Sequence, residues 1–404
     1  MKKPYLMPMI LMVCALLALP ILGCEGKKGD PGDPGTSELV NLEGFAPGIK
    51  CATCHVPDTD TTYYLLARDY QWNQSKHAYG GDSERNGGSC AGCHTTEGFI
   101  QRMKNLAAGS TSQAVTDQWQ PSPPGCFACH SPHLRANFSL RDTTPVTIAS
   151  YIVGESDAVF NYGKGNLCVK CHQTRTTSPM TPKPDPSKTA TTDTISITSN
   201  RWYPHYGVNG QMLMGVGGFK FQGYSYAGNS YHTTSATIQK EGCPVCHMAQ
   251  QTYPPNAGTG KGGGHTMNIR YEWEGSPGSV VTGCKTTGCH PSSITSPDIV
   301  GSSTGGVGAQ TLVTAYLDTL YRMMSDTNGV LTTQGYKRVW LIKDQASGDF
   351  TLNASTSKPL KIAPASRAGI IYNFFFLQHE GSHGVHNTKF AIDLLRSSVA
   401  ELRK

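Results

Sequence analysis

Five pentads of the form Cys-x-x-Cys-His recur along the chain, and one further cysteine pair is spaced more widely before its histidine. The six segments span residues 51–55, 90–94, 126–130, 168–172, 243–247 and 284–290. In this pattern two thiols can add to the vinyl groups of a haem, while the adjacent imidazole binds the iron from one face. Zinc knuckles also use Cys-x-x-Cys pairs, but they do not explain a histidine after every pair. The sequence therefore predicts six covalent c-type haems.

The cysteine count agrees with this interpretation. The chain has 14 cysteines, and all except Cys14 and Cys24 belong to the six segments, so none remains for a disulfide. The predicted attachment thiols are Cys51, Cys54, Cys90, Cys93, Cys126, Cys129, Cys168, Cys171, Cys243, Cys246, Cys284 and Cys289. The predicted proximal iron ligands are His55, His94, His130, His172, His247 and His290.

The second ligand of each iron decides whether a substrate can reach it. The chain has 14 histidines, so eight lie outside the six motifs: His77, His133, His205, His232, His265, His379, His383 and His386. Eight candidates are enough to close every iron with a second imidazole. His133 is too close in sequence to His130 to reach the far face of the same iron, so we expect it to serve a neighbouring haem.

The segments around these histidines resemble those of exported multihaem cytochromes c, related to the pentahaem nitrite reductase and octahaem hydroxylamine oxidoreductase superfamily. The resemblance covers residues 45–404 in patches, and its closing Gly-Val-His-Asn element selects His386 over His379 and His383. It implies His77, His133, His205, His232, His265 and His386 as distal ligands. It also implies a mainly α and irregular fold that is organised by covalent haems and ends in C-terminal helices.

One departure from that superfamily bears on activity. Its nitrite reductases bind the catalytic haem through Cys-x-x-Cys-Lys, and this chain has no such segment. Six distal histidines would leave every iron six-coordinate, so the sequence favours an electron carrier of anaerobic respiration over an enzyme. Two alternatives stay open. One is a reductase of nitrogen or sulfur oxyanions with one open iron, most suspect at 284–290, and the other is a subunit of a haem filament or outer-membrane conduit.

The N-terminus predicts export. A short positive start and an apolar run over about residues 9–22 are typical of a secretory signal, and residues 21–24 resemble a lipobox. We expect a signal peptide over 1–23 and acylation of Cys24, with an uncleaved anchor or a soluble secreted product as alternatives. Because Glu25 follows rather than Asp, the outer membrane is favoured, at its periplasmic face or the cell surface.

The remaining chain divides by composition. Residues 24–44 read as a flexible Gly/Pro/Lys tether, 45–300 as a multihaem region, and 301–404 as a helical region that contributes a distal ligand. Apolar periodicity predicts helices over 309–325, 365–379 and 388–403, the last capped by Asn387. These helices could pack within the chain or on a partner subunit. The Thr/Pro/Ser stretch 174–200 reads as a long surface loop, with disorder slightly favoured.

Charge and composition restrict the partners. The formal net charge is +6, but each oxidised haem would add about −1, so the apparent basicity is no sign of nucleic-acid binding. Only 38% of residues are hydrophobic, and six apolar porphyrins would supply much of the missing core. We expect redox proteins, a membrane reached through the lipid anchor, and further copies of the chain as partners.

Overall fold

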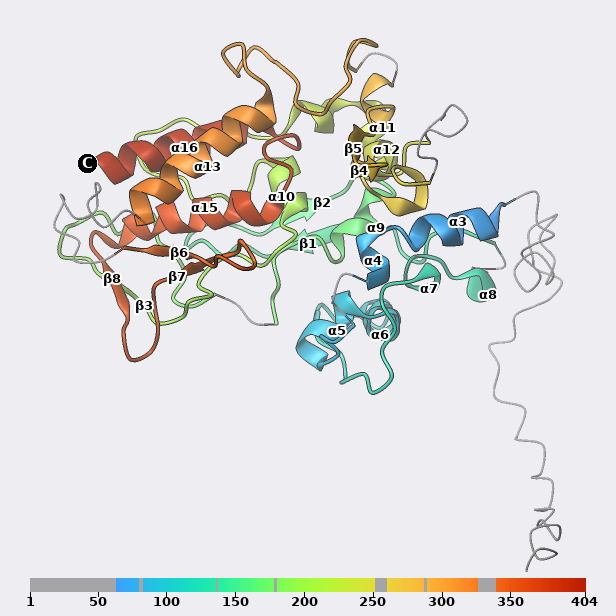
Figure 1. Cartoon of the computed structure of the whole chain (residues 1–404). Coiled ribbons are helices and arrows are strands. Elements are labelled where there is room, and N and C mark those ends of the chain that lie inside the picture. The colour runs from blue at the N-terminus through green and yellow to red at the C-terminus, as the bar shows by residue number, and fades with distance from the viewer. Residues whose placement is uncertain are drawn as a thin grey trace, which may run out of the picture.

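The computed structural model describes residues 63–79, 83–135, 137–177, 180–250, 260–286, 289–325 and 339–404. The predicted signal peptide, Cys24, the tether and the first cysteine motif lie outside the described residues. Two regions with different kinds of packing make up the described part (Figure 1). A cysteine-rich region contains the second to sixth cysteine motifs, and a helical region contains most of the C-terminal third.

The cysteine-rich region consists of short helices and irregular segments. Its helices are α3 (Leu65–Trp72), α4 (Lys76–Tyr79), α5 (Gly88–His94), α6 (Thr96–Ala107), α7 (Cys126–Cys129), α8 (Pro132–Arg135), α9 (Gly165–Val169), α10 (Asn209–Met214), α11 (Ala236–Glu241) and α12 (Pro244–His247). Its 3-10 turns are η4 (Tyr231–Thr234), η5 (Gly264–Thr266) and η6 (Gly283–Lys285). The expectation of a mainly helical and irregular fold is confirmed.

The strands are short and pair only in twos within the described residues. They are β1 (Val146–Ile148), β2 (Ala158–Phe160), β3 (Ile195–Ile197), β4 (Arg270–Trp273), β5 (Ser276–Ser279), β6 (Leu341–Lys343), β7 (Phe350–Leu352) and β8 (Leu360–Ile362). The antiparallel pairs are β1–β2, β3–β8, β4–β5 and β6–β7. Two-stranded ribbons of this size are marginal alone, so their stability depends on what they pack against.

The helical region contains α13 (Ala309–Ser325), η7 (Ala365–Arg367), α15 (Ala368–Glu380) and α16 (Thr388–Arg403). The predicted helices at 309–325 and 388–403 are confirmed, and the side chain of Asn387 accepts a hydrogen bond from the Phe390 amide as a cap. The helix predicted over 365–379 begins later, because residues 365–367 form the 3-10 turn η7 after Pro364.

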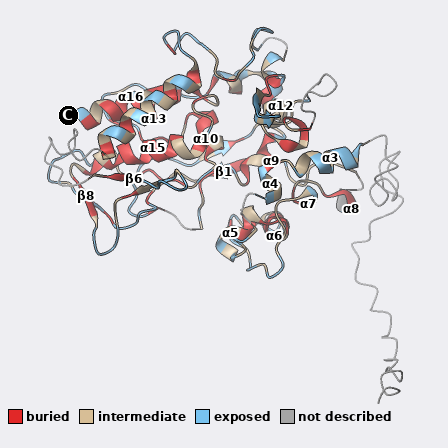
Figure 2. Cartoon of the chain, viewed as in Figure 1, coloured by how far each residue is buried: buried red, intermediate tan, exposed pale blue. Residues whose placement is uncertain are grey.

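Helix α15 is the centre of the large apolar core. It is apolar on nearly every side, as expected for a helix surrounded by other elements, and Figure 2 shows it buried along its length. Helices α13 and α16 pack against it and against each other, so the C-terminal helices form an intrachain core. Trp202, Trp340 and Ile197 join the same cluster from outside these helices.

The stretch 174–200 contains a strand, whereas the sequence predicts a long surface loop with disorder slightly favoured. Its last part forms β3, which pairs with β8 in register Ile195 to Ile362 and buries Ile195 and Ile197 in the core. The indole of Trp202 also donates a hydrogen bond to the Pro182 carbonyl at 2.7 Å. The alternating Ile-Ser-Ile pattern is a strand signal that the surrounding Thr and Ser residues obscured.

Across the described ranges, no helix combines the length and the apolar content needed to cross a lipid bilayer.

Candidate functional site

The cysteine motifs converge on one large cavity in the cysteine-rich region. The motif cysteines lie in or close to helices α5, α7, α9 and α12 and the turn η6. In the five-residue motifs, a helical turn brings the two cysteines, which are three residues apart, onto one face. The cavity has a volume of about 2100 Å³, and all ten described motif cysteines line it. A pocket for one small ligand has roughly 300–1,000 Å³, so this cavity has room for several.

The five described motif histidines each face a second histidine across this cavity. The ring centroids are 6.2 Å apart for His172 and His77, and 6.1 Å apart for both His94 with His205 and His247 with His386. They are 6.4 Å apart for His130 with His265 and 6.2 Å apart for His290 with His232. Each pair therefore joins a predicted proximal ligand to a predicted distal ligand from a distant part of the sequence.

The spacing of these pairs matches the geometry of one metal between two imidazoles. With a metal–nitrogen distance of about 2.0 Å and about 1.1 Å from that nitrogen to the ring centre, two opposed rings have centroids about 6.2 Å apart. The rings are too far apart to stack and too regularly spaced for unrelated side chains. These residues can therefore hold an iron between each pair of imidazoles.

The contacts of the Nδ1 atoms support an orientation of the rings in which Nε2 faces the metal. The Nδ1 atoms of His130, His205 and His247 lie 2.8, 3.0 and 3.1 Å from the carbonyls of Phe138, Tyr206 and Met267. An Nδ1–H that donates to a carbonyl leaves Nε2 unprotonated and free to bind a metal. Burial lowers the pKa of His247 to about 4, with the charge on His386 adding to the effect, so this ring stays neutral at physiological pH.

His133 is the predicted distal ligand that the structure does not place in a pair with a described histidine. It lies on α8 with an exposed side chain, and its ring centroid is 6.2 Å from that of Phe127. The first motif, which contains Cys51, Cys54 and His55, lies outside the described residues. Ligation of that motif's iron by His133 therefore stays a prediction.

His379 and His383, which the resemblance does not select as distal ligands, occupy other environments. The His379 ring stacks on Tyr206 with centroids 3.9 Å apart, and its Nδ1 lies 3.0 Å from the Pro204 carbonyl. The Nδ1 atom of His383 lies 2.9 Å from the Thr314 hydroxyl. In the part of the chain that the structure describes, neither ring faces a motif histidine as His386 does.

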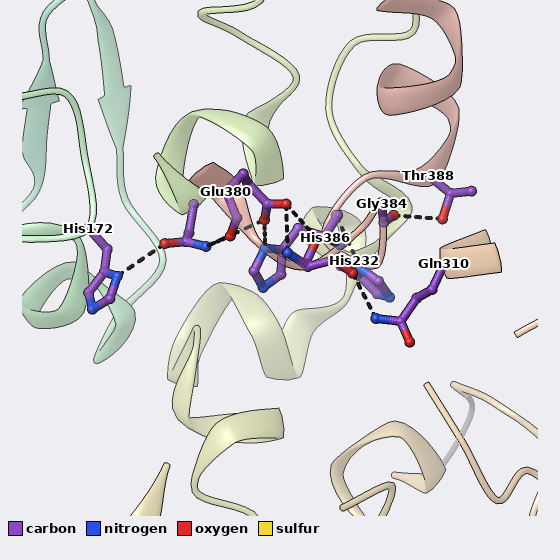
Figure 3. A network of polar contacts seen from close by, with 9 residues as sticks. His172, His232, Gln310, Glu380, Gly384, His386 and Thr388 are labelled. Atoms are coloured by element: carbon purple, nitrogen blue, oxygen red, sulfur yellow. Dashed lines mark hydrogen bonds and ion pairs between the residues drawn. The ribbon is translucent and has the colours of Figure 1, made fainter. Parts of the chain in front are cut away.

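A hydrogen-bond network connects ligands of different pairs (Figure 3). The Asn209 side chain contacts His172 Nδ1 through its oxygen at 3.0 Å and donates to the Glu380 carbonyl at 2.7 Å. The Glu380 carboxylate accepts from His386 Nδ1, and the His386 carbonyl lies 3.4 Å from His232 Nδ1. Sequence reasoning missed Asn209 and Glu380. A single Asn or Glu has no spacing signature, although Glu380 directly precedes the Gly381–Asn387 segment.

Buried positive charge lies between the second and fourth motifs. Arg102 donates hydrogen bonds to the Cys93 sulfur at 3.1 Å and to the Lys170 carbonyl at 2.7 Å. The Lys170 ammonium lies 3.4 Å from the Asp142 carboxylate. Neither residue was singled out in the sequence, because Lys170 occupies a variable motif position and Arg102 follows the motif on a separate helix.

The described residues do not support a zinc interpretation of the motifs. Within those ranges, no group of three or more His, Cys, Asp or Glu side chains is placed to hold a metal ion. A structural zinc site needs four such ligands in a tetrahedron. Opposed imidazole pairs beside separate thiol pairs fit the haem attachment predicted from the sequence.

Comparisons with known proteins give little beyond this geometry. No family model matches the chain, and no curated protein matches it. The predicted relation to the nitrite reductase and hydroxylamine oxidoreductase superfamily therefore stays a prediction. Among solved structures, the "Crystal Structure of Outer Cell Wall Cytochrome OcwA" is similar at 16% sequence identity and a TM-score of 0.37. The match covers 82% of this chain and 49% of that chain, so the chain spans about half of that protein's length.

Proposed function

We propose that this chain is a multihaem c-type cytochrome that transfers electrons through haems held by paired histidines. The observation that carries the proposal is the set of five opposed imidazole pairs, whose centroids are between 6.1 and 6.4 Å apart. Each pair combines a histidine of a cysteine motif with one from elsewhere in the chain. When bound, haem iron supplies reversible one-electron chemistry that no amino-acid side chain here provides.

The chain's own residues would attach, orient and enclose the haems. Two thiols of each motif would attach the haem, and the two histidines of each pair would hold its iron, which would leave no place on that iron for a substrate. The outer Nδ1 hydrogen bonds hold the rings in place. We propose six haems, with the sixth held by the first motif and His133.

Contacts between motifs support a continuous electron path. The Cys171 sulfur donates to the Cys93 carbonyl at 3.8 Å, so the second and fourth motifs touch. A contact between the Cys168 and Cys243 thiols raises the pKa of Cys168, and burial raises it further. Cys246 and Cys284 make a similar contact. The order second, fourth, fifth, sixth motif follows, and the third motif lies beside the fourth, because Cys129 and Cys171 pack against the same apolar cluster.

The structure weakens the main reason for the reductase alternative. From the sequence, the widely spaced motif at 284–290 is the strongest candidate for an open iron, because its distal histidine is the hardest to assign. The ring of His232 now faces that of His290 with centroids 6.2 Å apart. Electron transfer is therefore the function that the described geometry supports best.

Haem content and spin state test this proposal together. The intact mature protein should carry about six covalent haem masses and show low-spin spectra, with neither nitrite nor carbon monoxide perturbing more than a trace of the haem. A protein without covalent haem would refute the proposal. If about one sixth of the haem were high-spin and reactive with these ligands, the reductase alternative would replace it.

We also propose that the protein is lipid-anchored at Cys24 to the outer membrane and passes electrons to other cytochromes. The support is the lipobox-like segment 21–24 and the apolar run before it. Replacing Cys24 with Ser should release the protein from membranes and leave its haem spectrum unchanged. Wild-type protein that is found in the soluble fraction without detergent would rule out the anchor.

A further inference from the structure

His386 differs from other described ligands in the group that its outer nitrogen contacts. The Nδ1 atoms of the remaining ligands with a known contact meet neutral oxygens, namely those of Phe138, Asn209, Tyr206, His386 and Met267. His386 Nδ1 instead meets the carboxylate oxygen Oε1 of Glu380. A negatively charged acceptor polarises the ring more strongly than a carbonyl and makes Nε2 a better electron donor.

The hydrogen bonds around Glu380 require its ionised form. Its Oε2 atom accepts from the Ser382 amide at 3.0 Å and from the Ser382 hydroxyl at 2.7 Å. Its Oε1 atom accepts from His386 Nδ1, with the Asn209 amide group 3.4 Å away. Four donors surround two oxygens, and an ionised carboxylate accepts from all four, whereas a protonated carboxyl would need one of these groups to accept its hydrogen instead of donating. The carboxylate is the form that this environment stabilises.

Burial increases the effect of this charge. The Glu380 side chain has no exposed surface, and within the described ranges its charged partner is His386 alone. Electrostatic interactions are stronger in the protein interior than in water, because the surroundings are less polarisable. A fixed negative charge next to an axial ligand stabilises ferric over ferrous iron, since the ferric centre has the larger positive charge.

We propose that Glu380 is a positioning residue that orients His386 and lowers the reduction potential of the haem attached at Cys243 and Cys246. This inference rests on the proposed function. The haem at Cys243 and Cys246 lies between those at the fourth and sixth motifs in the path. It would then accept an electron less readily than either neighbour, because the Nδ1 atoms of His172 and His232 contact neutral oxygens.

The main test is Glu380→Gln in the full-length holoprotein, with a redox titration followed by absorbance. Glutamine keeps an acceptor for His386 Nδ1 and removes the charge. One of the six midpoint potentials should shift to a more positive value. The expected shift is a tenfold change in that haem's oxidised-to-reduced ratio, which is about 59 mV for a one-electron couple. The low-spin signal of one haem in electron paramagnetic resonance should shift with it.

The matched control is Glu155→Gln. Glu155 accepts hydrogen bonds from Ser150 at 2.8 Å and from the Gly217 amide at 3.3 Å, and it lies 3.8 Å from the Lys220 ammonium. Its partners among the described residues include no ligand histidine. All midpoints should stay in place in this variant. If Glu380→Gln loads low-spin haem and no midpoint moves positive, the inference is wrong, while the proposed electron carrier stands. Absence of haem in the wild type would instead refute the proposed function.

A second variant decides the question if Glu380→Gln does not accumulate. Ser382→Ala removes the hydroxyl that donates to Glu380 Oε2, so the carboxylate charge is less neutralised and acts more strongly on His386. One midpoint should then move negative, opposite to the shift in Glu380→Gln. An unchanged or positive midpoint in Ser382→Ala would overturn the inference.

Discussion

His379 and His386 lie on either side of the Gly381 turn, and their surroundings give them different roles. His379 is enclosed by aromatic rings, with Tyr206 at 3.9 Å and Tyr203 at 4.6 Å between centroids. His386 follows the turn, lines the cavity and faces His247, with ring centroids 6.1 Å apart. The chemistry of the imidazole is the same in both, so the position of the ring determines whether it can bind a metal.

Single substitutions should separate these roles. His386→Ala should open one axial position and convert about one haem in six to a high-spin, ligand-reactive form. His379→Ala removes stacking on Tyr206 but no axial ligand, so the haem should remain low-spin. Visible and electron paramagnetic resonance spectra with added carbon monoxide measure both. An equal high-spin signal in His379→Ala would show that the assignment is wrong.

Local patterns in the sequence predict the residues of the candidate site but not how these residues pair. Each cysteine motif can be read within a few residues, whereas the pairing of His77 with His172 or of His94 with His205 joins distant segments. Partner choice depends on how the short helices pack in three dimensions, which has no local signal. Glu380 was missed for the same reason, since its role comes from the neighbours that folding gives it.

At the scale of elements, the predictable helices were those with their own apolar face. Helices α13 and α16 show a periodic apolar stripe, and their bounds follow from it. Helix α15 is apolar on nearly every side, so no apolar stripe marks where it begins. The 3-10 turn η7 occupies the first three residues of the helix that the sequence predicts. In the cysteine-rich region α6 also has an apolar face, with Phe99 and Met103 buried, but the motif helices α5, α7, α9 and α12 are too short for a stripe and line the cavity.

Helix α13 begins at a carboxylate that acts as its cap. Asp298 accepts hydrogen bonds from the Gln310 amide at 2.7 Å and the Thr311 amide at 3.1 Å. The approach is close enough that a Cβ on Gly308 would lie 2.2 Å from Asp298 Oδ1. Burial acts to raise the pKa of Asp298, but the hydrogen bonds from Thr311 and Gln310 lower it below its ordinary value.

Asp298→Ala should therefore destabilise the start of α13 by about 1 kcal/mol. The amides of Gln310 and Thr311 should then exchange roughly fivefold faster. A lowered pKa in the folded protein means that Asp298 stabilises the fold above its ordinary pKa and loses this effect as the pH falls through the folded value. The difference between wild type and variant should shrink below about pH 4. Hydrogen exchange measures it, with Asp318→Asn on the same helix as control. A difference that grows on acidification would contradict this account.

The whole molecule combines two ways of filling an interior. The helical region packs Phe375, Trp340 and Trp202 into one large apolar cluster. The cysteine-rich region has only small apolar clusters, and a cavity of about 2100 Å³ occupies its centre. An unfilled apolar cavity of this size would collapse or admit water at a large cost in free energy. The bound haems would therefore be part of this region's core.

Protein made without haem attachment should accordingly lose one region and keep the other. We expect limited proteolysis of the haem-free chain to cut within 83–135 and 230–290, because the apolar cluster described for these segments is the small one around Phe99 and Met103. Peptides that cover α13, α15 and α16 should resist, because these helices share one large apolar core. Mass spectrometry of the fragments identifies the cut sites, and the holoprotein should resist in both regions under the same conditions. Equal protection of both regions in the haem-free chain would mean that the cysteine-rich region folds without haem, and its cavity would then need another explanation.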